Sequence, residues 1–588
     1  MTLLKRALIT APFWNKIIGS FHFPMNIQAS RIAQAAVLTA AVLLLLAPFA
    51  GKAFHIDDPM YIWAARQILD SPADFYGFQV NWEGYMAPMA EVMQNPPGVS
   101  YFIAAASTVA GFGEYGLHIA FLIPALAAAF GTLALARRFT ASPLLASLVA
   151  IATPVFAVSA STVMSDVLMV AFWVWSIETW VSGTDKGDHR RLAIAATLAG
   201  LGILTKYNAV SLFPLLAAYS LMKRRPGHLL WLLFPALMLL GFEAATAEMY
   251  GRGLFSKAAA YSSMIKGLLA TGAAEKGFTG LLFAGGSFLP VLFFLPFIRN
   301  FKVYAAVILF ASVALIVLLL SGGVGGMRVY REGGLDWAFM AHAIVFSAAG
   351  GGLLAIAVSD LLRERDPKAV LLFLWVAGTF VFSGFVNWTT NGRTLLPMAP
   401  AFGILIARAT GARRAGFSSW RLLPLLPAFL VALLVSAADF SLANSAREAA
   451  RTLLTRYSQQ NSASALWFQG HWGLQYYVEA WGGRVIDWRS TVLKRGDLVV
   501  IPLNNYDLVL PLERLSLADK LSLPLMSGAS TMHPSAGSSF YASIRNPLPF
   551  AFCLDAGEDY FIMRVREDID LPALLPGAIS KARRGPDR

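Results

Sequence analysis

The sequence predicts an all-α polytopic membrane protein with a small α/β domain at its C-terminus. Of the 588 residues, 57% are hydrophobic and only 14% are charged, whereas about a quarter of the residues of a soluble globular protein are charged. Apolar stretches recur that approach the roughly 20 residues needed to cross a bilayer. From 440 onward the chain is more polar and contains short β-like runs.

About thirteen membrane-spanning helices are expected from this pattern. The segments 35–50, 229–245 and 303–320 are typical, because each has no charged residue or a single one near its end. We expect 97–110 to lie along the membrane interface. The expected spans are 32–50, 117–136, 142–160, 164–181, 191–205, 208–222, 228–246, 278–298, 303–321, 338–358, 369–386, 394–409 and 420–438.

Lys and Arg residues gather in alternate short loops, such as those at 137–138 and 223–225. Cytoplasmic loops carry this excess, so 1–31 is predicted to be a cytoplasmic segment. The odd number of spans then places the loop 51–96 and the C-terminal domain, 440–588, outside. The formal charge of +13 is explained by orientation, and we expect no nucleic-acid partner.

The first outer loop contains two adjacent carboxylates, Asp57 and Asp58, which are followed by Pro59. A carboxylate here can act as a general base or bind a divalent metal ion. The simpler interpretation is that Asp58 and Pro59 begin and cap a helix over 60–69. The spacing alone leaves these alternatives open.

Asp166, Lys206 and Arg393 also lie at predicted outer ends of helices. Asp166 is either a helix cap or a functional acid. Lys206 and Arg393 either extend their charges towards water or bind phosphate oxygens. Their shared side is informative, because acids and cations at one membrane interface suit a substrate that is part lipid and part phosphate.

At these residues the sequence resembles the membrane glycosyltransferases of the C superfamily, family 39, which includes protein O-mannosyltransferases and lipid A aminoarabinose transferases. The matching elements are an acidic pair followed by Tyr and Ala-Arg, then Asn-Pro-Pro, Phe-Gly, Ser-Asp, Leu-Thr-Lys and Arg-x-Leu-Leu-Pro. Here they are Asp57-Asp58, Tyr61, Ala65-Arg66, Asn95 to Pro97, Phe112-Gly113, Ser165-Asp166, Leu204 to Lys206 and Arg393 to Pro397. One departure is that the family's acidic pair is usually Asp-Glu, which puts the role of Asp58 in doubt.

The resemblance implies the C-superfamily glycosyltransferase fold, with about thirteen helices and an outer C-terminal domain. It implies transfer of a sugar from a polyprenyl phosphate to a lipid, glycan or protein acceptor, with inversion. Asp57 would be the general base, with Asp58 and Asp166 as further catalytic candidates. Lys206, Arg393, Tyr61 and Arg66 would bind substrate.

We expect no metal ion and no cofactor. The expected location is the bacterial inner membrane, with the site facing the periplasm or exterior. The alternative function is a membrane transporter or lipid flippase, whose helices should be interrupted by Gly, Pro and charge near the middle of the membrane. Most charges of this chain lie instead near the predicted helix ends.

Overall fold

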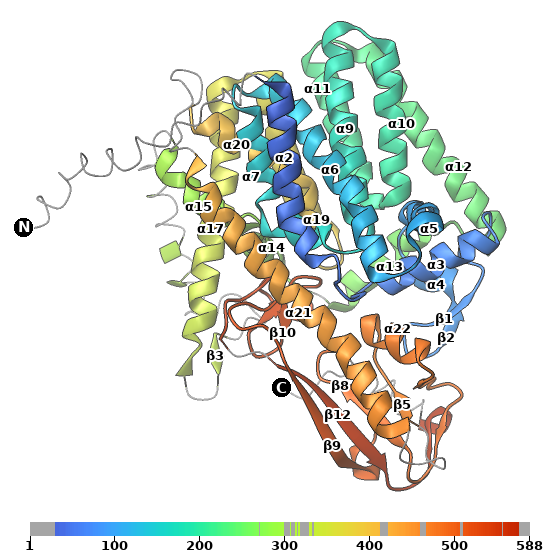
Figure 1. The fold of residues 1–588 in the computed structure, drawn as a ribbon. Coiled ribbons are helices and arrows are strands. Elements are labelled where there is room, and N and C mark those ends of the chain that lie inside the picture. Colours follow the sequence, from blue (N-terminus) through green and yellow to red (C-terminus); the bar gives the residue numbers. More distant parts are fainter. Residues whose placement is uncertain are drawn as a thin grey trace, which may run out of the picture.

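A bundle of helices and a group of C-terminal strands lie at opposite ends of the molecule, and the long helix α21 (Leu425–Ser458) connects them (Figure 1). We call the end of the bundle that faces the strands the sheet end and the opposite one the far end. The computed structural model describes residues 30–574 except for 270, most of 299–328, 332–333, 412–421, 459–465, 506–509 and 555–556.

The described residues contain seven helices that are long and apolar enough to cross a membrane, or up to nine spans if two bent helix pairs are counted. The polytopic membrane class is therefore confirmed, whereas thirteen spans stay a prediction. The expected span 303–321 lies almost entirely outside the described residues. The seven helices are α2 (Arg31–Leu46), α6 (Glu114–Phe139), α9 (Ser165–Lys186), α12 (Leu233–Tyr250), α17 (Trp337–Glu364), α18 (Pro367–Val381) and α21.

The expected single helix over 142–160 is two helices, α7 (Pro143–Ile151) and α8 (Pro154–Ala160), which meet at an angle of 65°. Pro154 has no N–H to donate and disfavours a helical conformation in the residue before it. The Thr153 side chain accepts the hydrogen bond of Phe156 N and caps the new helix. A second bend of 65° separates α14 (Ala273–Ser287) from the segment that begins with α15 (Val291–Phe294).

The first long loop folds against the sheet end as α3 (Asp58–Asp70), β1 (Gln79–Asn81), β2 (Met86–Pro88) and α4 (Met89–Val92). The following helix, α5 (Gly98–Ala110), packs on α3 and touches the end of α10 (His189–Thr205). A Cβ atom on Gly98 would lie 2.5 Å from the carbonyl oxygen of Leu204, so glycine permits this approach. Since Lys206 follows α10 directly, the contact places the start of α5 beside that lysine.

The second long loop, expected over 247–277, contains the helix α13 (Leu254–Leu269). The Glu243 carboxylate accepts hydrogen bonds from the backbone N–H groups of Phe255 and Ser256, which satisfies donors in its first turn. Lys257 donates to the carbonyl oxygens of Ala90 and Met93 at 2.5 and 3.1 Å. The two outer loops are therefore joined to each other.

The C-terminal strands form a five-stranded sheet in the order β6-β5-β8-β12-β9, and the expected runs 465–468, 498–502 and 560–565 all contribute strands. β5 is parallel to β6 and β8, and β12 is antiparallel to β8 and β9. α22 (Trp472–Ala480) packs against α21. The strands are β5 (Leu466–Phe468), β6 (Arg484–Val485), β8 (Leu498–Pro502), β9 (Leu515–Pro524) and β12 (Gly557–Val565).

The last expected span was to end at 438, but α21 continues to Ser458. No Gly or Pro follows Pro427 in this helix, so the backbone has no reason to break where the hydropathy falls. The predicted domain boundary between 439 and 440 thus lies inside one helix. A separate C-terminal α/β domain remains a prediction.

Candidate functional site

Asp57 lies at the N-cap position of α3, but its side chain makes no capping hydrogen bond. The preceding residue, Ile56, has φ of +48°, in the left-handed region that β-branched residues rarely adopt. This turn directs the Asp57 carboxylate away from the α3 backbone and towards Arg393, which donates to it. Asp57 therefore occupies the cap position of α3 without capping the helix.

Asp58 has a different environment, although it is the next residue. Its side chain is fully buried and accepts hydrogen bonds from His55 N at 2.8 Å and Val163 N at 2.9 Å. Burial raises the pKa of Asp58 to about 7, and the two hydrogen bonds oppose that rise. Its carboxyl group fastens the first loop to the turn between α8 and α9 and does not cap α3.

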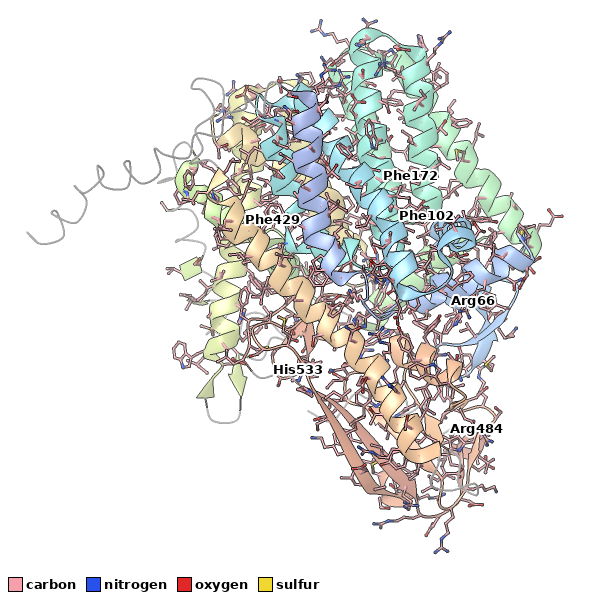
Figure 2. The ribbon with its side chains drawn as sticks, viewed as in Figure 1. Arg66, Phe102, Phe172, Phe429, Arg484 and His533 are labelled. Carbon is pink, nitrogen blue, oxygen red and sulfur yellow. The ribbon has the colours of Figure 1, made fainter. Side chains whose placement is uncertain are left out.

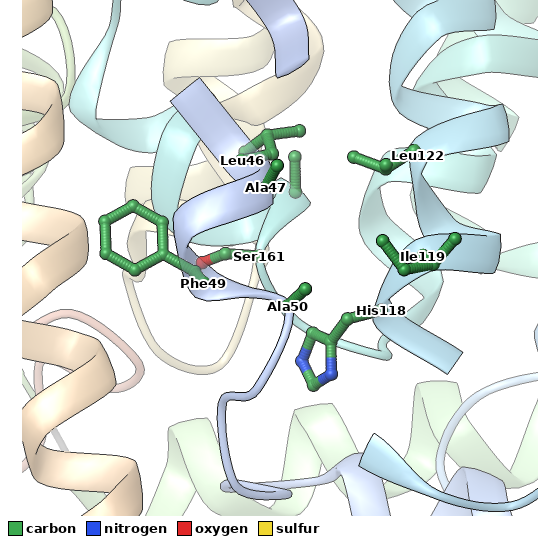
Figure 3. A pocket seen from close by; sticks show the side chains of 9 residues that line it. Leu46, Ala47, Phe49, Ala50, His118, Ile119, Leu122 and Ser161 are labelled. Carbon is green, nitrogen blue, oxygen red and sulfur yellow. The ribbon is translucent and has the colours of Figure 1, made fainter. Parts of the chain in front are cut away.

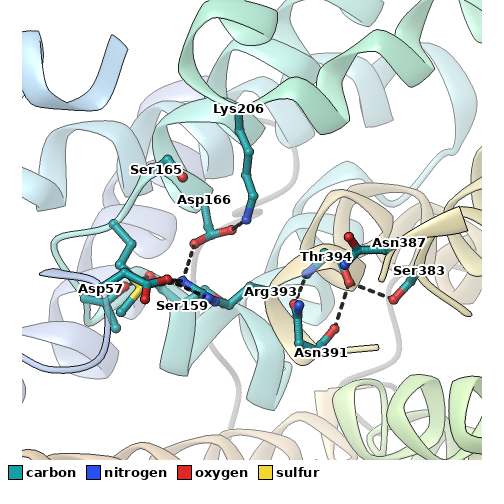
Figure 4. A network of polar contacts seen from close by, with 12 residues as sticks. Asp57, Ser159, Ser165, Asp166, Lys206, Ser383, Asn387, Asn391, Arg393 and Thr394 are labelled. Atoms are coloured by element: carbon teal, nitrogen blue, oxygen red, sulfur yellow. Dashed lines mark hydrogen bonds and ion pairs between the residues drawn. The ribbon is translucent and has the colours of Figure 1, made fainter. Parts of the chain in front are cut away.

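Four charged side chains from separate segments, one of them Asp57, meet in one cluster (Figure 4). Both Nη atoms of Arg393 donate to Asp57 Oδ2 at 2.9 Å. Lys206 Nζ donates to Asp166 Oδ1 at 2.5 Å, and Arg393 Nη1 lies 3.9 Å from Asp166 Oδ2. The structure therefore brings together four of the residues predicted from sequence as a chain of alternating charges.

Each of these side chains is placed by a helix end. Asp166 is in the first turn of α9, and Lys206 is the C-cap residue of α10. Arg393 is in the short helix α19 (Gly392–Leu395), where the Asn391 side chain accepts the hydrogen bond of Thr394 N at 2.8 Å. Lys206 is buried and paired, so the alternative in which it extends towards water is wrong.

Exposure differs along this chain of charges. The side chains of Asp166 and Lys206 are 0% and 10% exposed, whereas that of Asp57 is 25% exposed. Asp57 is thus the most accessible of the four charged groups. The Asp57–Arg393 pair is therefore the more exposed of the two ion pairs.

The two remaining predicted substrate-binding residues are placed differently. The Tyr61 hydroxyl lies 3.2 Å from Ser165 Oγ, next to Asp166. Arg66, labelled in Figure 2, is on α3 nine positions after Asp57, which is about 13 Å along a helix. Its guanidinium contacts the Tyr476 hydroxyl at 3.2 Å and the Phe112 ring at 5.1 Å. The structure does not bring Arg66 to the charge cluster.

A second buried ion pair was missed by the sequence analysis. Lys52 Nζ lies 2.5 Å from Asp439 Oδ2, and both side chains are fully buried. Asp439 also accepts hydrogen bonds from the hydroxyls of Thr531 and Tyr541 at 2.8 and 2.7 Å. A lone acid inside an apolar helix is the signal that could have identified Asp439. No local pattern indicates Tyr541, which comes from a loop about a hundred residues later.

The described part of the chain offers few other places for a charged ligand. No group of three or more His, Cys, Asp and Glu side chains there could hold a metal ion. Figure 3 shows a crevice beside the end of α2, where His118 and Ser161 supply the only polar side chains among nine lining residues. This crevice and a second one, lined by His55, Asn504 and Glu558 among others, have no Lys or Arg side chain that could hold a phosphate, so we take the charge cluster as the candidate site.

Residues 94–245, about a quarter of the chain, match the family model of the dolichyl-phosphate-mannose-protein mannosyltransferases. The match contains Asp166 and Lys206; it begins after Asp57 and ends before Arg393. It confirms the resemblance that the motifs predicted and indicates a membrane glycosyltransferase. Among curated proteins, none matches this chain.

Several solved structures are similar to part of this chain. The oligosaccharyltransferase of Archaeoglobus fulgidus in its apo form is 13% identical to this chain with a TM-score of 0.45. The aligned region covers 77% of this chain and 64% of the oligosaccharyltransferase. ArnT from Cupriavidus metallidurans bound to undecaprenyl phosphate is 15% identical with a TM-score of 0.38, and the aligned region covers 80% of this chain and 93% of ArnT. The arabinofuranosyltransferase AftD from Mycobacteria is 13% identical with a TM-score of 0.35, and the aligned region covers 91% of this chain and 40% of AftD.

The chain thus spans just under two thirds of the length of the oligosaccharyltransferase. All of these TM-scores are below 0.5, so nothing about substrates or partners follows from the structural likeness.

Proposed function

We propose that this chain, as a membrane glycosyltransferase, transfers a sugar from a polyprenyl-phosphate donor to a lipid, glycan or protein acceptor. The observation that carries the proposal is the charge cluster. Two carboxylates and two cations from four separate segments lie in one chain of contacts, and its Asp57–Arg393 end is partly exposed. Undecaprenyl phosphate bound to the solved ArnT is an example of the donor lipid class.

In the proposed reaction, Asp57 is the general base. Its carboxylate accepts a proton from an acceptor O–H or N–H group while that oxygen or nitrogen forms a bond with the anomeric carbon of the sugar. The bond between this carbon and the phosphate oxygen breaks, and the electron pair leaves with the polyprenyl phosphate. Attack from the opposite face inverts the configuration of the anomeric carbon.

Arg393 is proposed to hold the donor phosphate, because its planar guanidinium can donate two hydrogen bonds to phosphate oxygens. In this structure both Nη atoms are taken up by Asp57. A guanidinium has five N–H donors, and Nε has no partner here, so we propose that the phosphate takes over the Nη donors and thereby frees the Asp57 carboxylate to act as base. Binding of the donor would thus produce the active form of the base.

Lys206 is proposed to attract the phosphate electrostatically, as a point charge that lies deeper in the site than Arg393. Its pairing with the fully buried Asp166 makes an exchange of partners harder than for Arg393. Asp166 then serves to keep Lys206 and Arg393 near each other. Asp58, buried under two backbone N–H groups, is assigned a supporting role and not a catalytic one.

The test is an assay of purified protein with a panel of radiolabelled polyprenyl-phosphate sugars and membrane extracts as the source of acceptors. At least one donor is expected to lose its sugar to a lipid, glycan or protein fraction, and Asp57→Asn should abolish this transfer. If undecaprenyl phosphate does not bind and no donor is consumed, the proposal fails.

We further propose that the site faces the periplasm or exterior of a bacterial inner membrane, in a chain of about thirteen spans. Support comes from the Lys and Arg bias of the loops. Reporter fusions after residues 225 and 460 should report the cytoplasm and the outside, respectively. If both fusions report the same side, the proposed orientation is wrong.

A transporter or flippase is a second candidate, because transporters often contain broken helices at their binding sites. Here α7 and α8 form such a pair, and α8 leads into the turn that binds Asp58. Vesicles that contain the purified protein would move a fluorescent polyprenyl phosphate across the bilayer without cleaving it if this alternative holds. Cleavage without lipid movement favours the transferase.

A further inference from the structure

Asp439 is the centre of a buried network that reaches both partners of the Asp57–Arg393 ion pair. The carboxylate lies inside α21 and is fully buried. Its Oδ2 accepts from Lys52 Nζ at 2.5 Å and from the Tyr541 hydroxyl at 2.7 Å, and its Oδ1 accepts from Thr531 at 2.8 Å. Lys52 is five residues before Asp57, and the Tyr541 ring lies under Arg393.

The segment that leads to Asp57 is held at consecutive residues by α21 and α22. After the Lys52–Asp439 pair, Ala53 N donates to the Asn444 side chain at 2.9 Å. Phe54 N then donates to the Tyr477 hydroxyl at 2.8 Å. The path of the backbone into the turn at Asp57 is thus set by residues 387 to 423 positions later in the chain.

The segment that carries Arg393 is held by the loop around Tyr541. The Arg393 guanidinium carbon lies 5.5 Å from the centre of the Tyr541 ring, within the range of a cation–π interaction. Gly392 N donates to the carbonyl oxygen of Phe540 at 2.9 Å, and Ser543 N donates to that of Thr390 at 2.8 Å. One C-terminal loop therefore contacts the Arg393 guanidinium with a ring and holds the backbone next to Arg393 by hydrogen bonds.

A buried ion pair is a poor means of gaining stability, because the cost of removing both charges from water offsets most of their attraction. Apolar side chains of similar size would pack the same space at least as well. A fixed set of directional contacts is what the charges provide beyond packing. Asp439 receives three donors that come from the first loop and from two positions in the C-terminal segment.

We propose that Asp439 is a positioning residue that sets the separation of Asp57 and Arg393 by holding their two loops through Lys52 and Tyr541. The proposal rests on the proposed roles of Asp57 as base and Arg393 as phosphate contact. It gives the C-terminal segment a function, because Thr531 and Tyr541 of that segment join Asp439 to the loop that supports Arg393. Asp439 itself touches no reacting atom.

The first test needs no substrate. In the full-length protein, the double substitution Lys52→Met with Asp439→Leu removes both buried charges and keeps the apolar volume. Hydrogen exchange at backbone amides of 52–57 and 389–393 is expected to rise in both segments together, by about tenfold or more, because the shared anchor is lost. Unchanged exchange in either segment would overturn the proposal.

A matched control is available at the far end of the bundle. Asp360 and Arg408 form another buried ion pair, with Nε 2.9 Å from Oδ1. The double substitution Asp360→Leu with Arg408→Met should leave exchange in 52–57 and 389–393 unchanged. If this control raises exchange in the same two segments, the effect reflects general loosening of the bundle, and the proposal is rejected.

The second test measures how the network acts on transfer. Lys52→Met with Asp439→Leu should lower kcat/KM by about a hundredfold, since a displacement of about 1 Å in a catalytic group has this effect. In an Arg393→Ala background, the same double substitution should cost clearly less than a hundredfold, because the branch through Tyr541 then has no arginine to position and only the branch through Lys52 still acts, on Asp57. Full multiplication of the two effects would show an independent, merely structural role.

The Tyr541→Phe variant keeps the ring below Arg393 and removes only the hydroxyl that binds Asp439. It should fold, and its kcat/KM should lie between those of the wild type and the double variant; a wild-type value would exclude the Tyr541 branch. If the wild type transfers no sugar and does not bind undecaprenyl phosphate, the proposed function fails. The exchange experiment would still decide whether Asp439 joins the two loops.

Discussion

Both ends of the helical bundle contain buried ion pairs, but the cations at the two ends have different additional partners. At the far end, Lys368 Nζ donates to the carbonyl oxygen of Arg138 at 2.5 Å, and Arg408 Nη1 donates to that of Phe139 at 3.3 Å. These carbonyls end α6, whose last turn has no helical partners for them. At the sheet end, Arg393 and Lys206 donate instead to the side chains of Asp57 and Asp166.

We propose that this difference separates a structural use of charge from a functional one. A cation that satisfies a backbone carbonyl cannot leave without exposing a buried acceptor, which costs about 1–3 kcal/mol. A cation paired with a partly exposed carboxylate can exchange it for a phosphate oxygen and keep the same number of charged contacts. Of the four cations compared above, Arg393 is therefore the one whose carboxylate partner is exposed enough for such an exchange.

The largest expected effect is that of Asp57→Asn. Loss of a general base lowers the rate by about 10²–10⁴-fold, while the amide retains the size of the side chain. Transfer should nearly disappear, whereas insertion into the membrane and binding of undecaprenyl phosphate stay near the wild-type level. Single-turnover rates with a labelled donor measure this. Wild-type turnover would exclude Asp57 as base and make Asp166 the next candidate.

Asp58→Asn sharpens this prediction within the same loop. Its carboxyl group holds two backbone N–H groups, so the change should affect stability more than chemistry. The expected loss of kcat is smaller than for Asp57→Asn, and the protein should unfold at a lower temperature. Equal losses of kcat in both variants would contradict the separate roles.

The second effect in size concerns the two cations of the sheet end. Arg393→Ala and Lys206→Ala should weaken use of the donor by roughly ten- to a hundredfold, because a hydrogen bond to a charged group is worth about 1.5–3 kcal/mol. Lys206→Ala also leaves Asp166 buried without its closest partner, so it should lower stability as well. Dependence of the initial rate on donor concentration separates these effects, and unchanged kinetics in both variants would remove the phosphate role.

The third prediction tests the far end. Asp360→Asn disrupts a pair in which both side chains are 4% exposed, and such a loss destabilises a protein by about 3–5 kcal/mol. The rate of transfer per folded molecule should stay at the wild-type value, because no substrate contact is lost. Thermal unfolding in detergent and the same transfer assay measure both quantities. A lower rate per folded molecule would show that the far end also serves the reaction.

The smallest expected effect is on stability and concerns Glu558, a buried acid whose hydrogen-bond partner, Asn504, is uncharged. Glu558 in β12 accepts a hydrogen bond from the Asn504 amide, and burial raises the pKa of Glu558 from 4.5 to about 7. Its stabilising contribution is therefore complete below pH 4.5, where both states are protonated, and is lost as the pH rises through 7. Glu558→Gln should leave stability unchanged at pH 4 and increase it at pH 8 by at most about 3 kcal/mol. Equal stabilities at both pH values would contradict this prediction.

Much of the fold follows from hydropathy. The apolar runs correctly predicted the membrane class and most of the helices, because a helix that crosses a bilayer must be apolar along its whole length. Breaks were harder to place. Pro154 divides an expected helix, while the fall in hydropathy near Asp439 does not end α21, because a helix continues through polar residues that favour it.

The candidate site was predicted in part. Asp57, Asp166, Lys206 and Arg393 were found because each is a charged residue next to an apolar segment, where a charge is costly. Tyr541 could not be found in this way, since its position under Arg393 arises only when the C-terminal segment folds back on the bundle. Arg66 matched a motif, but the direction of α3 carries it away from the cluster.

The sequence by itself thus determined that this is a membrane protein with charges at helix ends and a resemblance to glycosyltransferases. The tertiary structure alone decided which charges meet and what each can do. Asp57 and Asp58 are the same residue type at adjacent positions, yet one pairs with Arg393 and the other holds two backbone N–H groups. The physical reason is that a carboxylate takes its role from the donors around it, and those donors come from segments far away in the chain.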